Sequence, residues 1–352
     1  MPSYSFLDRM LHRAALQVVP IAELSFDLDQ KSIDKKARDV TNEKHVFVSG
    51  LARAGTTILM RRFYATGQYC SLTYRNMPFI LAPNLWAKLS GLSAKTIEAS
   101  ERAHGDRILV DVDSPESFDE VFWRIFDGGN YIGKTFLAPH TPDADVIGQF
   151  RSYVAAILAS DGRPDARYLS KNNNNILRLK AIRQAFPNAV ILIPFRNPIS
   201  HAASLLRQDQ NFIEEQEKDS FVRSYMTWLG HHEFGQDHRP FRMMADGAER
   251  LKALSRDRIG YWLELWCQTY GWLEEHAPED AIFVCYEDLC QNPDVWSRLA
   301  ALSDAGSPDD ESNEAFVISD KRGEADAFPE LVDRASAIYD RLAGRARRAL
   351  GL

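Results

Sequence analysis

A short apolar segment followed by two closely spaced glycines constrains the fold of this chain more than any other feature. Residues 45–49 read His-Val-Phe-Val-Ser, an apolar, β-branched run that predicts a buried strand. The turn Gly-Leu-Ala-Arg-Ala-Gly follows at 50–55, and residues 56–67 have a helical pattern with Thr at its start and Gly at its end. This order of strand, glycine-rich turn and helix predicts the first βα unit of a phosphate-binding sheet.

Further apolar segments alternate with helical patterns along the chain. We expect strands at 107–112, 166–171, 189–195 and 281–286. The helices that follow them are expected at 116–127, at 174–186, from Pro198 to about Gln208, and from about Asp288 to Ala301. Such alternation is typical of a parallel sheet that is covered by helices on both faces. The predicted fold class is α/β, with a P-loop-type central parallel sheet and mainly helical insertions.

The rest of the chain is interpreted as additions to a single α/β domain that spans residues 1–352. Residues 1–44 are predicted to be an N-terminal helical extension, and 209–260 a helical or loop insertion with solvated polar stretches. Residues 303–352 are predicted to be a loop followed by an amphipathic helix. The aromatic-rich segment 261–273 is expected to be a core helix.

Charge and composition exclude several classes of protein. Lys and Arg total 42 against 49 Asp and Glu, for a formal net charge of −7, whereas a general nucleic-acid binder carries a basic excess. The 4 cysteines include no CxxC pair, which excludes a disulfide framework and a zinc-finger pattern. His231, His232 and His238 lack Cys or carboxylates at metal-ligand spacing, so we interpret them as surface histidines and expect no metal.

Hydropathy gives no membrane span. The longest apolar runs fall far short of the roughly 20 residues that cross a bilayer. The N-terminal stretch carries Asp8, Arg9 and Arg13 among its apolar residues, which a signal peptide lacks. We therefore expect a cytoplasmic protein.

The frame from Gly50 to Gly55 matches a P-loop, in which backbone N–H groups turn towards an anion at a helix N-terminus. Nucleotide triphosphatases have a Lys at the position of Thr56, where it contacts the β- and γ-phosphates, so its absence weighs against a kinase or an ATPase. Arg53 supplies a cation inside the loop instead. The alternative interpretation is a plain turn between a strand and a helix.

A second pattern follows the most apolar predicted strand. Arg196 ends this strand, at the edge of an open α/β sheet where ligands bind, and Ser204 lies about two turns into the next helix. Both side chains can therefore face one anion, and the forked donors of Arg suit a phosphate. Taken alone, the pattern also fits an Arg–carboxylate pair and a serine on a helix surface.

Together, the segments Gly50-Leu-Ala-Arg-Ala-Gly-Thr-Thr57 and Arg196-Asn-Pro-Ile-Ser-His-Ala-Ala-Ser204 resemble the sulfotransferase family that uses 3′-phosphoadenosine-5′-phosphosulfate (PAPS). The resemblance spans about residues 45 to 300 and includes Tyr286-Glu-Asp-Leu289 after the last predicted strand. The layout is similar to the branch that contains tyrosylprotein and carbohydrate sulfotransferases. The first segment departs from the common Pro-Arg-Ser-Gly-Thr-Thr, and the missing Ser removes one hydroxyl donor but leaves the backbone of the loop.

The resemblance implies roles for particular residues. It implies that PAPS, and its product 3′-phosphoadenosine-5′-phosphate (PAP), bind at the loop and at Arg196, Ser204 and Tyr286. Lys171 matches a Lys that the protein-tyrosine branch places beside the transferring group. Lys321-Arg322-Gly323 is similar to an element that closes over the 3′-phosphate. The loop residues implied in binding are Gly50, Leu51, Ala52, Arg53, Ala54, Gly55, Thr56 and Thr57.

Sulfuryl transfer needs cations at the leaving phosphate oxygen and a base for the acceptor hydroxyl. Arg53 and Lys171 are the candidate cations. The segment 71–76, which corresponds to that of the branch's catalytic Glu, contains no acid, so we assign the base to Glu116. The alternative for Glu116 is a charge that stabilises a helix N-terminus.

The acceptor is predicted to be a hydroxyl compound, and carbohydrate, lipid, phenol and peptide all remain open. We assign Arg75 and the loop histidine His140 to its binding, with a surface ion pair as the alternative for Arg75. Residues 74–140 and 209–260 are expected to shape the acceptor pocket.

Two other functions compete with sulfuryl transfer, a P-loop nucleotide kinase or NTPase and a non-catalytic nucleotide-binding protein. The sequence leaves a homodimer open.

Overall fold

The computed structural model describes residues 5–33, 38–90, 100–101, 109–110, 116, 118–307, 316–317 and 328–352. These residues form a five-stranded sheet, all parallel, in the order β2-β5-β1-β6-β7. Its strands are β1 (Val46–Val48), β2 (Tyr69–Cys70), β5 (Arg167–Lys171), β6 (Val190–Phe195) and β7 (Ile282–Cys285). Because β1 lies between β5 and β6, the glycine turn that follows it lies at the middle of the sheet edge.

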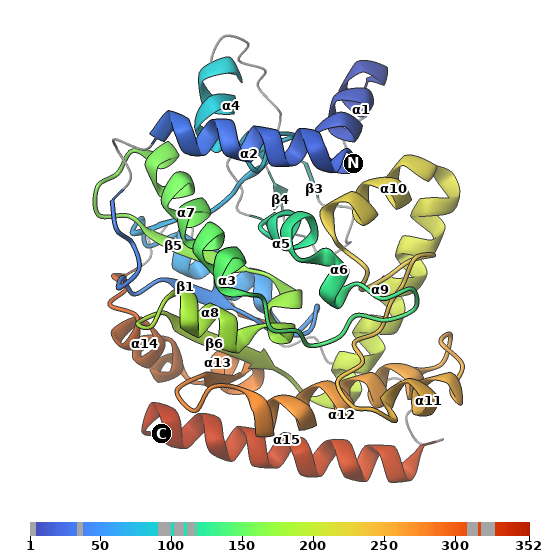
Figure 1. The fold of residues 1–352 in the computed structure, drawn as a ribbon. Coiled ribbons are helices and arrows are strands. Elements are labelled where there is room, and N and C mark those ends of the chain that lie inside the picture. The colour runs from blue at the N-terminus through green and yellow to red at the C-terminus, as the bar shows by residue number, and fades with distance from the viewer. Residues whose placement is uncertain are drawn as a thin grey trace.

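Helices surround this sheet (Figure 1). In the first half of the chain they are α1 (Phe6–His12), α2 (Val19–Ile33), α3 (Thr56–Tyr64), α4 (Pro83–Ser90), α5 (Glu120–Phe126), α6 (Gly128–Tyr131) and α7 (Ala144–Asp161). In the second half they are α8 (Leu179–Ala185), α9 (Pro198–Lys218), α10 (Ser220–Leu229), α11 (Gly247–Lys252), α12 (Ile259–His276), α13 (Tyr286–Gln291), α14 (Pro293–Leu302) and α15 (Pro329–Leu350). Within the described residues, no helix has both the length and the apolar character that crossing a bilayer requires.

Side chains that alternate along the strands divide the core into two layers, because successive strand residues point to opposite faces. Phe47 and Ile191 belong to the larger layer, together with residues of α7, α8, α9 and α12. Val48 and Leu192 belong to the smaller layer, together with residues of α3, α13 and α14. The sheet is therefore covered on both faces, as the α/β pattern predicts. α15 contacts β7 at one edge of the sheet, and Figure 1 shows it on the opposite side of the molecule from α2.

The predicted strand at 107–112 is wrong as a member of the parallel sheet. Its described part, β4 (Leu109–Val110), pairs antiparallel with β3 (Ser100–Glu101) in a separate two-stranded sheet. The position on the far side of β5 is taken by β2, whose two residues are too few to show a periodic pattern. The other predicted strands lie within one residue of β1, β5, β6 and β7.

Several helices differ from the prediction at their ends, and the one expected at 116–127 begins only at Glu120. The helix from Pro198 continues to Lys218, well into the segment interpreted as an insertion. The helix expected at 174–186 begins as a 3₁₀ turn over Asn173–Leu177 and becomes α8 only at Leu179. The helix expected near 288–301 is divided into α13 and α14, because the Asn292 side chain caps a new helix that has Pro at its first turn.

The interpretation of 231–240 as solvated surface, with surface histidines, is wrong. His232 and Phe234 are buried, with 2% and 6% of their surface exposed. The ring nitrogens of His238 contact the carbonyl oxygen of Glu233 and the hydroxyl of Tyr261, at 2.7 and 2.9 Å. The two ring nitrogens of His238 are therefore satisfied inside the protein, which composition alone did not indicate.

Candidate active site

Two glycines allow the turn after β1 to pack closely against the neighbouring strand ends. Gly55 is the N-cap of α3 and has a left-handed backbone with φ of 86°. A Cβ atom on Gly55 would lie 2.4 Å from the ring of Tyr286, and one on Gly50 would lie 2.7 Å from the carbonyl oxygen of Pro194. Both positions therefore require glycine, for space and, at Gly55, also for conformation.

A buried histidine fixes the shape of this turn. His201, on α9, has Nε2 2.8 Å from the carbonyl oxygen of Ala52. Burial, together with the nearby charge of Arg196, lowers the pKa of His201 to about 3. The imidazole is thus neutral at pH 7, and its Nε2–H donates to Ala52. Because the same helix carries Ser204, the turn and the second motif are joined by one element.

The second motif lies beside the turn. Arg53 donates from Nε to the Ser204 hydroxyl at 3.3 Å, and Arg196 at the end of β6 lies 5.8 Å from the centre of the Tyr286 ring. Arg196 is 8% exposed. Four residues that the sequence assigned to nucleotide binding, from β1, β6, α9 and α13, are thus brought to one edge of the sheet. The two guanidinium groups make this edge suited to an anion.

Glu287 stabilises the chain next to Arg196. Its carboxylate accepts the backbone N–H of Asn197 at 2.9 Å, directly after Arg196, and the hydroxyl of Tyr339 at 3.1 Å. The Tyr286 hydroxyl donates to the carbonyl oxygen of Val317 at 3.1 Å. The tyrosine–acid segment therefore holds both the Arg196 turn and part of the C-terminal region.

A cavity of about 140 Å³ lies next to the glycine turn. Its lining has three parts: residues of the turn and α3, a group of polar side chains, and an apolar wall. The lining residues are Ala52, Arg53, Thr56, Thr57, Tyr74, Glu116, Phe118, Lys171, Asn173, Gln208, Phe212, Tyr225, Met226, Leu229, His231, Glu233 and Phe234. Three candidate catalytic residues, Arg53, Lys171 and Glu116, therefore share one cavity.

Two ion pairs form the polar part of the lining. Lys171 Nζ lies 3.7 Å from Glu116 Oε1, and His231 Nδ1 lies 3.4 Å from Glu233 Oε1. Burial opposes the charge of His231, but Glu233 outweighs it and raises the pKa of His231. Burial would raise the pKa of Glu233, but the charge of His231 and hydrogen bonds from His231 and Asn173 lower it. The pairing therefore favours the charged form of both side chains.

The sequence analysis missed His231 and Glu233 as cavity residues. They follow Gly230, which ends α10 in a left-handed conformation. A His and a Glu two residues apart, directly after a helix-ending glycine and before a Phe, were the available signal. Their position opposite Lys171 depends on how α10 packs, which the local sequence does not show.

Two residues assigned to acceptor binding lie elsewhere. Neither Arg75 nor His140 is among the residues that line the cavity. Arg75 lies in a 3₁₀ turn over Tyr74–Asn76. The weakest motif match, Lys321-Arg322-Gly323, lies outside the described residues.

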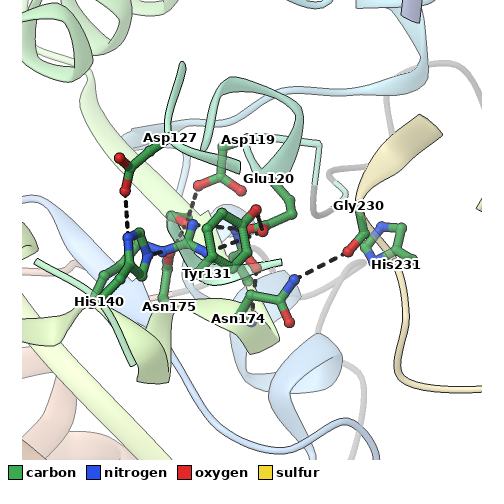
Figure 2. Close-up of polar contacts among 12 residues, drawn as sticks. Asp119, Glu120, Asp127, Tyr131, His140, Asn174, Asn175, Gly230 and His231 are labelled. Carbon is green, nitrogen blue, oxygen red and sulfur yellow. Dashed lines mark hydrogen bonds and ion pairs between the residues drawn. The ribbon is translucent and has the colours of Figure 1, made fainter. Parts of the chain in front are cut away.

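His140 belongs to a buried polar network, shown in Figure 2. Arg178 Nε lies 3.0 Å from His140 Nε2, and because a guanidinium group can only donate, Nε2 must accept. The proton is therefore on Nδ1, which donates to Asp127. Burial and the charge of Arg178 lower the pKa of His140 to about 2, so the ring is neutral.

The centre of this network is the ion pair between Glu120 and Arg178, whose side chains are both 0% exposed. Arg178 donates to the two carboxylate oxygens at 2.9 and 3.0 Å, and Asn172 donates to the same carboxylate at 2.8 Å. Asn174 donates to the carbonyl oxygen of Gly230 at 3.2 Å (Figure 2). The network therefore connects the turn after Lys171 to the residue before His231.

The asparagine segment 172–175 is a turn with a helix cap. The side chain of Asn172 accepts the backbone N–H of Asn174 at the start of the 3₁₀ turn. Among the residues that the structure describes, no group of three or more His, Cys, Asp or Glu side chains is placed to hold a metal ion.

The chain is similar in structure to sulfotransferase STF9 from Mycobacterium avium, with 14% identity, 97% of this chain and 86% of that chain covered, and a TM-score of 0.48. It is also similar to sulfotransferase STF1 from Mycobacterium tuberculosis H37Rv, with 14% identity, 97% of this chain and 87% of that chain covered, and a TM-score of 0.47. A search of curated protein sequences finds no match. A model of the sulfotransferase family matches residues 45–299, which include both motifs and most of the chain, so this protein belongs to the sulfotransferase family.

Proposed function

We propose that this protein transfers a sulfuryl group from PAPS to the hydroxyl of an acceptor. The observation that carries the proposal is the common cavity of Arg53, Thr56, Thr57, Lys171 and Glu116 beside the glycine turn. This cavity brings together an anion-binding loop, a cation outside the loop and a carboxylate. Those are the three groups that sulfuryl transfer to a hydroxyl needs.

The donor nucleotide binds across the edge of the sheet. Its 5′-phosphosulfate lies on the backbone N–H groups of the turn and the hydroxyls of Thr56 and Thr57, at the N-terminus of α3. Its 3′-phosphate is bound by Arg196 and Ser204. The hydrogen bond from Arg53 to Ser204 supports this placement, because it joins the glycine turn to the helix that carries Ser204.

The reaction is an in-line displacement at sulfur. The acceptor oxygen forms a bond to sulfur while the bond from sulfur to the 5′-phosphate oxygen breaks, and PAP leaves with the electron pair. Arg53 and Lys171 stabilise the negative charge that grows on this oxygen. Glu116, whose carboxylate lies 3.7 Å from Lys171, takes the proton of the acceptor hydroxyl.

Nucleotide binding separates this function from that of a nucleotide triphosphatase. We expect calorimetry to show that PAP binds without Mg²⁺ and more tightly than ATP, because Thr56 stands where a triphosphatase has its Lys. Tighter binding of ATP that depends on Mg²⁺, or no binding of PAP, would contradict the proposal. Transfer of labelled sulfate from PAPS to any hydroxyl compound excludes a non-catalytic nucleotide-binding protein.

Replacing Arg196 with alanine is expected to weaken PAP binding by about 2–3 kcal/mol, since a charge-assisted hydrogen bond to the 3′-phosphate is lost. The control is Arg298→Ala, which removes the same charge from an exposed position on α14. Calorimetric titration of both variants with PAP measures the difference. Equal affinities in the two variants would show that the 3′-phosphate binds elsewhere.

A further inference from the structure

The apolar wall of the cavity contains information about the acceptor. Phe212 on α9 and Phe234 have stacked rings with centres 6.0 Å apart, and Tyr74 meets Phe118 edge to face at 5.1 Å. Leu229, near the end of α10, is 5% exposed and adds to the same wall. Aromatic side chains and Leu229 thus line the space beside the polar groups.

The charges of the lining cancel one another. Lys171 faces Glu116, and His231 faces Glu233, so each cation beyond the glycine turn has a carboxylate beside it. Arg53 carries the remaining positive charge among the lining residues, and it lies in the loop that binds the donor. Among the described lining residues outside the glycine turn, the two cations are therefore matched by two carboxylates, which favours an uncharged acceptor.

Several polar groups of the lining are bonded to one another. Asn173 donates to Glu233 at 3.1 Å, and Glu233 pairs with His231, so these three side chains already form hydrogen bonds with one another. A sugar carries hydroxyls around its whole ring, and those against the apolar wall would lose their hydrogen bonds with water and gain none. A peptide backbone would meet the same cost.

We propose that the acceptor is an uncharged phenol, whose aromatic ring lies against Phe212, Phe234 and Leu229. This inference rests on the proposed function and names its substrate class. The phenol oxygen attacks the sulfur of PAPS, its proton passes to Glu116, and the sulfur–oxygen bond to PAP breaks. The products are an aryl sulfate and PAP. Flat rings pack well on aromatic side chains, which favours a phenol over an aliphatic alcohol.

A panel of acceptors tests the proposal with the full chain and labelled PAPS. We expect kcat/KM for 2-naphthol to exceed that for N-acetylglucosamine, for cyclohexanol and for a tyrosine-containing peptide. The ratio of 2-naphthol to N-acetylglucosamine is expected to be at least about 100. A preference for any of the other three acceptors would overturn the proposal. Binding of PAP, measured beforehand, keeps the two hypotheses apart: no PAP binding contradicts the proposed function, whereas PAP binding without transfer to 2-naphthol contradicts the phenol.

A pair of variants locates the ring. Leu229→Asn places a polar group of similar size in the wall and is expected to raise KM for 2-naphthol about tenfold, whereas Leu229→Met keeps the wall apolar and leaves KM within about twofold. Neither change should alter PAP affinity much, because Leu229 belongs to the apolar wall and the glycine turn that binds the nucleotide is unchanged. Equal KM values in the two variants, both with unchanged PAP affinity, would show that the acceptor ring lies elsewhere.

Discussion

Replacing Lys171 with methionine is expected to lower kcat by about 10²–10³-fold, the usual cost of losing one group that stabilises the transition state. Lys171 ends β5, lines the cavity and is 7% exposed, so water substitutes poorly for its charge. Affinity for PAP is expected to change much less than kcat, because the charge on the leaving oxygen is larger in the transition state than in the donor.

Steady-state rates of labelled sulfate transfer, together with calorimetry with PAP, measure these two effects. Lys180→Met is the matched control. Lys180 is exposed on α8, so its replacement removes the same charge outside the cavity. The variant also leaves Glu116 without its cation, so the midpoint of thermal unfolding is recorded for each protein. A folded Lys171→Met protein with kcat close to that of the unchanged protein would remove Lys171 from the catalytic group.

The residues that we propose bind the nucleotide could be placed at the sheet edge from the sequence, because they lie in short local patterns. Gly50, Gly55 and Arg53 fall within one turn, and Arg196 and Ser204 within one strand–helix junction. Each pattern is tied to a geometry that a βα unit imposes, such as the left-handed Gly55 at the N-cap of α3. Parallel pairing then brings the strand ends together without further information from the sequence.

The acceptor side could not be predicted in the same way. His231 and Glu233 reach the cavity because α9 and α10 fold back over the sheet edge, and the segment that carries them is polar in composition. His140 is the opposite case, a residue that we expected in the acceptor site and that lies outside the cavity lining. It has the chemistry of a functional loop residue, but Arg178 and Asp127, distant from it in sequence, enclose it in a buried network.

Breaking the ion pair between Glu120 and Arg178 is expected to have the largest effect on stability in this protein. The Arg178→Met variant leaves a buried carboxylate with hydrogen bonds from Tyr131 and Asn172 but without its cation. Removal of one partner from a fully buried pair costs about 3–5 kcal/mol of unfolding free energy. Arg341→Met is the control, because the pair between Arg341 and Glu274 is partly exposed and contributes about 0–1 kcal/mol.

Denaturation by urea measures both variants, and a double replacement separates charge from packing. Glu120→Leu together with Arg178→Met removes both charges, so it is expected to be more stable than Arg178→Met alone, since no ion is left buried without a partner. A loss below about 1 kcal/mol in Arg178→Met would mean that water reaches Glu120. The double variant still lacks the contacts that hold Asn172, next to Lys171, so we expect it to recover stability without recovering kcat. Recovery of both would show that this network stabilises the fold without positioning the cavity residues.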